Sequence, residues 1–110
     1  MDVDYYWSAV SCLEVFMGDP EHYLPSTIVY LDDIQYPAHN RWQGELLAVD
    51  EFNERHDTRK ITPFNFLRAS RLFKRPVWID HLYTLHVLDH PSRTVDQPES
   101  EPVVLKNPYL

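Results

Sequence analysis

A run of β-branched and apolar residues, Ser26 to Leu31, ends directly in two aspartates, Asp32 and Asp33. Such a run is typical of a strand that is buried on both faces of a parallel sheet. A second acidic pair, Asp2 and Asp4, lies at the start of the chain, and the stretch between the two pairs has the length of one crossover helix. Because ligands bind outside the carboxyl ends of parallel strands, we expect up to four carboxylates to meet at one edge of a sheet.

The expected elements follow one another in the order of an α/β protein. The clearest helix carries Glu45, Asp50, Glu51 and Glu54, which we expect to face water. The sequence predicts a strand end at residues 1–4, a helix at 7–17, a strand at 26–31, a helix at 44–56, a strand at 59–66, a short helix at 67–74 and a strand at 77–89. We therefore expect a partial α/β domain over residues 1–90 and a loosely ordered tail over residues 91–110.

Charge and composition narrow the classes of partner. The net charge of −7 argues against nucleic acid or an anionic membrane. No apolar run approaches the roughly 18 residues of a membrane span, and the acidic start differs from a signal peptide, so we expect a cytoplasmic protein. The two glycines, Gly18 and Gly44, do not form a glycine-rich nucleotide cradle. The single cysteine, Cys12, cannot form an internal disulfide, and we expect it to pack as a small apolar residue.

Aspartate pairs that follow strands are compatible with three roles. They can hold Mg²⁺ or Ca²⁺, which prefer oxygen ligands. One member can have a raised pKa and act as a general base. The pair can also cap the next helix by accepting hydrogen bonds from its backbone. The sequence alone leaves these three roles open.

The histidines and aromatic residues offer weaker candidates. His39, in the loop after Asp32 and Asp33, is a candidate auxiliary base or substrate contact, whereas His81, His86 and His90 are expected to form ordinary polar contacts rather than a metal site. An aromatic group near the acidic pairs could wall a pocket for a sugar or aromatic acceptor, or could pack in the core and at its rim. Its members are Tyr5, Tyr6, Trp7, Tyr36 and Trp42.

Three segments of the chain resemble a known enzyme family. They are Asp2 to Ser8, with an Asp-x-Asp start; Ile28 to Asp33, an apolar strand ending in Asp-Asp; and Gly44 to Phe52, which contains Ala-Val-Asp-Glu-Phe. Together they resemble the second half of macrocin O-methyltransferase-type enzymes, which are S-adenosylmethionine-dependent methyltransferases of antibiotic and sugar tailoring. The similarity covers residues 2–61, a little over half of the chain.

The resemblance implies a fold, a site and a reaction. The fold would be the C-terminal half of a Rossmann-like methyltransferase sheet with flanking helices, with the N-terminal cofactor half absent. Asp2, Asp32 and Asp33 would bind Mg²⁺, which orients a substrate diol, and Asp4 would be the general base that removes the hydroxyl proton. The family's glycine-rich loop for S-adenosylmethionine has no match, so we expect O-methyl transfer only if another chain supplies that half.

Two other functions remain open. Because a half sheet would leave a long unpaired strand edge, the chain could be a non-catalytic binding or assembly module that recruits a partner chain, or self-associates, through that edge. A divalent-metal hydrolase could use the same carboxylates, although no set of histidines and glutamates that would activate a nucleophile is evident at useful spacing.

Overall fold

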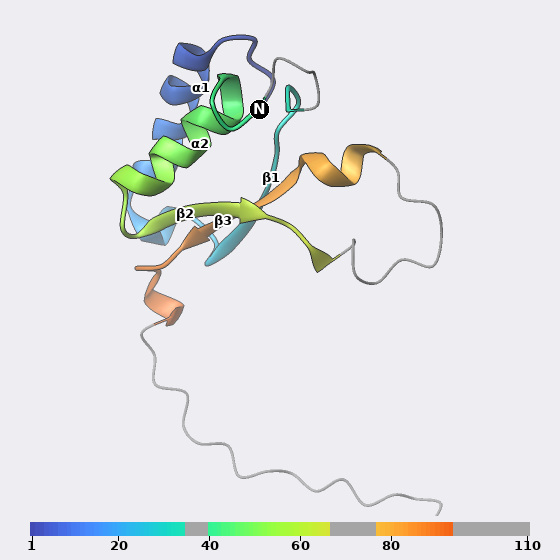
Figure 1. The fold of residues 1–110 in the computed structure, drawn as a ribbon. Coiled ribbons are helices and arrows are strands. Elements are labelled where there is room, and N and C mark those ends of the chain that lie inside the picture. The colour runs from blue at the N-terminus through green and yellow to red at the C-terminus, as the bar shows by residue number, and fades with distance from the viewer. Residues whose placement is uncertain (35–39, 67–76, 94–110) are drawn as a thin grey trace, which may run out of the picture.

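The computed structural model describes residues 1–34, 40–66 and 77–93 (Figure 1). Two helices lie on one face of a three-stranded sheet. The helices are α1 (Tyr6–Leu13) and α2 (Gly44–Arg55), and the strands are β1 (Ser26–Tyr30), β2 (Arg59–Pro63) and β3 (Leu82–Val87). Short 3-10 helices span Glu14–Met17, Pro20–His22, Val77–His81 and Pro91–Arg93. The predicted short helix at 67–74, and the predicted tail beyond residue 93, lie outside the described residues.

The sheet is antiparallel between neighbours, with the strand order β1-β3-β2. The chain is thus an α/β fold as predicted, but the neighbouring strands of the described sheet are antiparallel, not parallel as was expected. The difference arises because β3 is inserted between β1 and β2 and runs against both of them. Consequently β1 and β2 run in the same direction, and α2 connects them.

Strand β1 is buried on one face only, which corrects the prediction of a strand buried on both. Val29 and Leu31 point into the core, whereas Ile28 and Tyr30 are 51% and 40% exposed. Side chains alternate between the two faces of a strand, and both described helices cover the same face. The apolar run therefore reflects β-propensity at Ile28 and Tyr30 rather than burial.

The core lies between the two helices and the covered face of the sheet. Its fully or nearly fully buried residues are Ala9, Leu13, Val29, Leu31, Ala48, Val49, Phe52, Ile61, Leu85 and Val87. On α2 these residues fall three and four apart, as helix periodicity requires. Cys12, the neighbour of buried Leu13, is exposed rather than packed in this core.

The third strand is shorter than predicted. Residues 77–81 form a 3-10 helix, and extended structure begins only at Leu82. His81 marks the change: its ring Nδ1 lies 2.5 Å from the carbonyl oxygen of Leu31, and its own carbonyl accepts from the Leu31 N–H at 2.9 Å. Its ring also stacks on Tyr30. These contacts fix His81 at the end of β1 and end the regular strand there.

A buried arginine ties the opposite end of the sheet to the segment after α1. Arg59, which is 2% exposed, donates to the carbonyl oxygens of Phe16 and Gly18, each at 3.0 Å. It also forms an ion pair with Asp89. Because Phe16 belongs to the 3-10 helix that follows α1, these bonds hold the α1 segment against β2 and β3.

Candidate metal site at the end of β1

The start of the chain pairs with the carboxyl end of β1. The amino group of Met1 donates to the carbonyl oxygen of Tyr30 at 2.5 Å, and the N–H of Asp32 donates to the carbonyl oxygen of Met1 at 3.0 Å. In parallel pairing, the N–H of a residue donates to the residue before its partner, and its C=O accepts from the residue after its partner. Met1 and Leu31 are thus paired as neighbouring parallel strands would be, beyond the three strands of the sheet.

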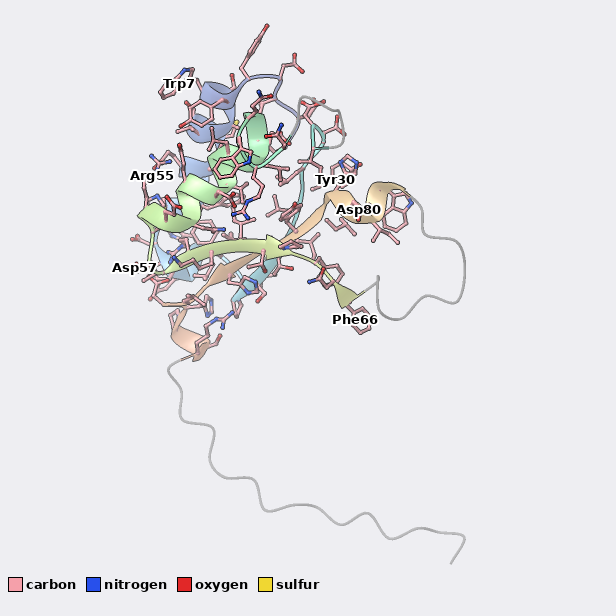
Figure 2. All side chains as sticks on the ribbon, in the orientation of Figure 1. Trp7, Tyr30, Arg55, Asp57, Phe66 and Asp80 are labelled. Carbon is pink, nitrogen blue, oxygen red and sulfur yellow. The ribbon has the colours of Figure 1, made fainter. Side chains whose placement is uncertain are left out.

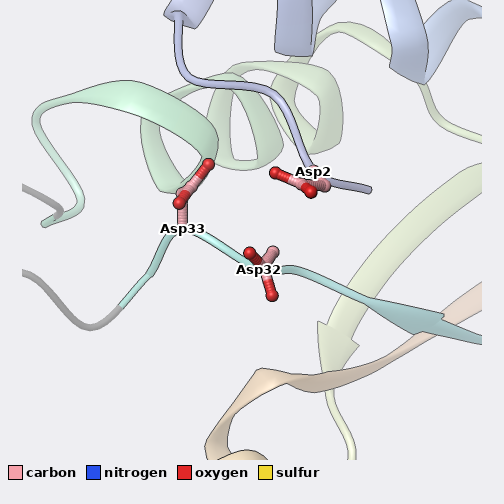
Figure 3. A group of neighbouring side chains, drawn as sticks. All are labelled: Asp2, Asp32 and Asp33. Carbon is pink, nitrogen blue, oxygen red and sulfur yellow. The ribbon is translucent and has the colours of Figure 1, made fainter.

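This pairing brings three aspartates together. Carboxylate oxygens of Asp2, Asp32 and Asp33 all lie within 4.8 Å of one another. Figure 3 shows Asp2 on the N-terminal segment, facing Asp32 and Asp33 on the segment that leaves β1. Asp2 and Asp32 are exposed and Asp33 is half-buried. These are the three residues that the family resemblance implied as ligands, so the structure places them in one cluster.

A fourth carboxylate, Glu45, supports the cluster from α2. Glu45 is 1% exposed, and its Oε2 accepts a hydrogen bond from the N–H of Asp33 at 3.2 Å. Burial raises the pKa of Glu45, while the N–H groups of Asp33 and Val3 act in the opposite direction. Glu45 therefore contacts both segments that carry the aspartates.

The prediction that Glu45 faces water was wrong. A signal in the sequence could have corrected it, because Glu45, Ala48, Val49 and Phe52 share the spacing of one helix face. Gly44, the first residue of α2, has a φ of 58°. Only glycine adopts this left-handed conformation without steric cost, so Gly44 allows the chain to enter α2 with Glu45 directed inward.

The electrostatics of the cluster favour a bound cation. At a separation near 4.8 Å, two unit charges repel by about 1 kcal/mol in water and about 3 kcal/mol near a protein surface. In addition, Asp33 Oδ2 and Glu45 Oε1 are buried without a hydrogen-bond donor among the described residues. Buried carboxylate oxygens without a partner are costly. A hard divalent cation would neutralise the repulsion and can be coordinated by such oxygens.

The other predicted site residues do not join this cluster. Asp4, the expected general base, is exposed and is not among the three clustered aspartates. His39, the expected auxiliary base, and Tyr36 lie outside the described residues. His86 contacts the hydroxyl of Thr62 at 2.8 Å, which is an ordinary polar contact.

The described members of the aromatic group near the acidic pairs, for which a pocket wall and core packing were both left open, lie mostly outside the core. Tyr5, Trp7 and Trp42 are 73%, 75% and 79% exposed. Figure 2 shows Trp7 on the outer side of α1, away from the sheet. Tyr6 is turned toward α2, where its hydroxyl donates to the carboxylate of Glu51.

Comparison with known proteins does not assign a family. Family models, curated proteins and solved structures all gave no match. Within the described ranges, none of the helices combines the length and the apolar character needed to cross a membrane. The site is therefore interpreted from its own geometry.

Proposed function

We propose that this chain binds Mg²⁺ through Asp2, Asp32 and Asp33 and forms the acceptor-binding part of a Mg²⁺-assisted O-methyltransferase. The observation that carries the proposal is the approach of three carboxylates from two separate segments to within 4.8 Å of one another. One buried oxygen each of Asp33 and Glu45 supports it, because neither has a hydrogen-bond partner within residues 1–34, 40–66 and 77–93 and both leave coordination capacity beside the cluster.

The exposure of the cluster suits a substrate-orienting role. Asp2 and Asp32 are open to solvent, so an ion held here would keep coordination positions for a substrate. Mg²⁺ typically uses one or two carboxylates and fills its remaining positions with water or substrate oxygens. Such an ion supplies charge stabilisation and lowers the pKa of a coordinated hydroxyl. The acceptor would be a sugar or natural product with a hydroxyl to methylate.

The strand directions support the finer fold proposal, a Rossmann-like methyltransferase half. Strands β1 and β2 are parallel and joined through α2, and Met1 extends the parallel direction on the far side of β1. Mixed sheets, which combine parallel and antiparallel strands, are common among large sheets of α/β proteins. Strand β3 would be the antiparallel strand of such a sheet.

The glycines of this chain do not fit a glycine-rich binding site for S-adenosylmethionine. Gly18 follows a 3-10 helix and Gly44 begins α2, so neither belongs to a glycine-rich turn after a strand. We therefore assign methyl transfer only to an assembly in which another segment binds the methyl donor. Asp4 would act as the base in that assembly, by the family resemblance alone.

Calorimetric titration with MgCl₂ tests the cation site. We expect weak binding by the unmodified chain and a loss of affinity of about tenfold or more in Asp33→Asn, which keeps the side-chain size but removes a charge. Asp57→Asn is the matched control, because Asp57 is exposed in the turn between α2 and β2 (Figure 2). Binding that is absent, or equally reduced in both variants, would contradict the proposal.

A further inference from the structure

The edge of the sheet formed by β1, residues 26–30, presents backbone groups for another strand. Leu31 donates to His81 at 2.9 Å and Val87 donates to Pro25 at 3.0 Å, so odd-numbered residues on this side bond to the β3 segment. Since bonding alternates along an antiparallel pair, the N–H and C=O groups of Ser26, Ile28 and Tyr30 face away from β3. We call this row the β1 edge.

Met1 already occupies one end of the β1 edge and fixes a direction. Its parallel pairing uses the carbonyl oxygen of Tyr30. A strand that continued this pairing along β1 would place residues opposite Val29 and Thr27. Those residues would bond to the N–H of Tyr30, to both groups of Ile28 and to the carbonyl of Ser26.

An open apolar groove lies directly beside this edge. It has a volume of about 440 Å³ and is lined by Met1, Ser11, Cys12, Val15, Phe16 and Val29. Val29 points to the helix-covered face of the sheet, and residues opposite each other in parallel strands share a face. A side chain of an added strand opposite Val29 would therefore enter the groove, and the side chain opposite Thr27 would lie on the same face of the sheet.

We infer that the β1 edge binds an extended segment of a partner protein, which runs parallel to β1 and directs alternate apolar side chains to the face of the sheet that carries the groove. This is recognition by strand addition, in which main-chain bonds supply affinity and the groove supplies specificity. The inference goes beyond the cation site and does not depend on it. Two copies of the chain would each carry a charge of −7, and their repulsion disfavours a second copy as the occupant.

A short peptide and the single cysteine provide the test. The probe is an acetylated peptide of about seven residues that alternates valine and threonine after an initial lysine, a length typical of a strand. Iodoacetamide reacts with Cys12, which is exposed in the free chain and lines the groove. With EDTA present to remove divalent cations, we expect saturating peptide to slow this reaction by about threefold or more, because the bound strand covers the thiol.

Two variants separate the edge from the groove. Ile28→Pro removes an N–H that faces outward without removing a bond to β3, and proline is tolerated in edge strands. Val15→Glu places a charge in the groove, and Leu24→Glu is its control, because both residues are 67% exposed and only Val15 lines the groove. We expect Ile28→Pro and Val15→Glu to abolish protection of Cys12 and Leu24→Glu to preserve it.

The direction of the bound strand and the identity of the molecule that supplies it are tested by separate measurements. A nitroxide on the peptide's N-terminus should broaden the amide signal of Thr27 more than that of Tyr30, and the reverse order would overturn the parallel arrangement. The inference would also be overturned by unchanged Cys12 reactivity, by equal protection from a peptide of the same composition without alternation, or by sedimentation showing that the chain pairs with itself through this edge.

Discussion

The two outer strands of the described sheet, β1 and β2, differ in what covers their outward backbone groups. On β2, the side chain of Asn53 binds both backbone groups of Ile61, accepting from the N–H at 2.7 Å and donating to the carbonyl at 2.8 Å. Pro63, the next residue on that edge, has no N–H to donate. On β1, Met1 contacts one end of the edge. The backbone N–H and C=O groups of Ile28 face outward, beside the apolar groove. Proteins commonly block strand edges to prevent unwanted pairing, so we assign the proposed strand addition to β1 rather than to β2.

The largest expected effect comes from Arg59, the buried first residue of β2. Arg59→Met should lower the free energy of unfolding by about 3 kcal/mol, because it leaves the carbonyls of Phe16 and Gly18 without their buried donor. Urea denaturation followed by circular dichroism measures the change. Arg55→Met, on the exposed end of α2, is the control and should change stability by less than about 0.5 kcal/mol. Similar losses in both variants would show that the Arg59 contacts add little.

Removing the Asn53 side chain, which covers the backbone groups of Ile61 on the β2 edge, should have a smaller effect on stability and a measurable effect on strand binding. Asn53→Ala should lower the free energy of unfolding by about 2 kcal/mol, because two hydrogen bonds to Ile61 are lost. It should also open the β2 edge to strand addition, so the alternating valine and threonine peptide should bind there and shift the amide signal of Ile61. Glu54→Ala, on the exposed face of the same helix, should do neither. An Ile61 amide that the peptide leaves unshifted in Asn53→Ala would argue that the two edges differ for another reason.

A charge on the open edge should cost almost no stability. Ile28 is 51% exposed on the uncovered face, so Ile28→Lys should change the free energy of unfolding by less than about 0.5 kcal/mol. The same change should suppress binding of apolar strands, because edge lysines oppose strand addition. Thermal unfolding and the Cys12 protection assay measure the two effects. A large loss of stability would mean that Ile28 is covered in solution.

The smallest effect concerns α1, whose 3-10 extension forms one wall of the groove. The hydroxyl of Tyr6 donates to Glu51, and this bond raises the pKa of Tyr6 above its ordinary value near 10. Because the pKa is raised in the folded state, the stability from this contact is fully present below the unfolded pKa and is lost as the pH rises through the folded pKa.

Glu51→Gln tests this contact. The amide removes most of the cause of the shift, so the pKa of Tyr6 should fall toward its ordinary value. An NMR titration of the tyrosine rings, with Tyr6→Phe used to assign the signal, provides the measurement. An unchanged Tyr6 titration in Glu51→Gln would show that the contact with Glu51 is absent in solution.

Local patterns predicted the elements better than their arrangement. The helix predicted at residues 44–56 is confirmed as α2 (Gly44–Arg55), and the strand predicted at residues 59–66 is confirmed in its first half as β2 (Arg59–Pro63). The antiparallel insertion of β3 was missed because strand order depends on long-range pairing, which β-propensity does not encode. The end of regular structure at His81 depends likewise on a contact with Leu31, which lies 50 residues away.

Part of the aspartate cluster could be predicted from the positions of the two acidic segments in the sequence. The rule that ligands gather at the carboxyl ends of parallel strands predicted that the two acidic segments meet, and the parallel pairing of Met1 beside β1 brings Asp2 to Asp32 and Asp33 although residues 1–4 form no regular strand. Asp4 did not join them, because the chain turns toward α1 before it reaches Tyr6. The role of Glu45 was missed because a glutamate in an acidic helix favours the interpretation of a solvated residue, although its position on the apolar face indicated burial.

Amide NMR during a Mg²⁺ titration tests the central claim most directly, namely that the Met1 segment pairs beside β1 and thereby creates one cation site. We predict a contact between the Met1 Hα and the Asp32 amide before Mg²⁺ is added, and saturable shifts confined to Asp2, Asp32, Asp33 and their neighbours afterwards. The absence of that contact, or shifts spread instead along the acidic face of α2, would contradict the account.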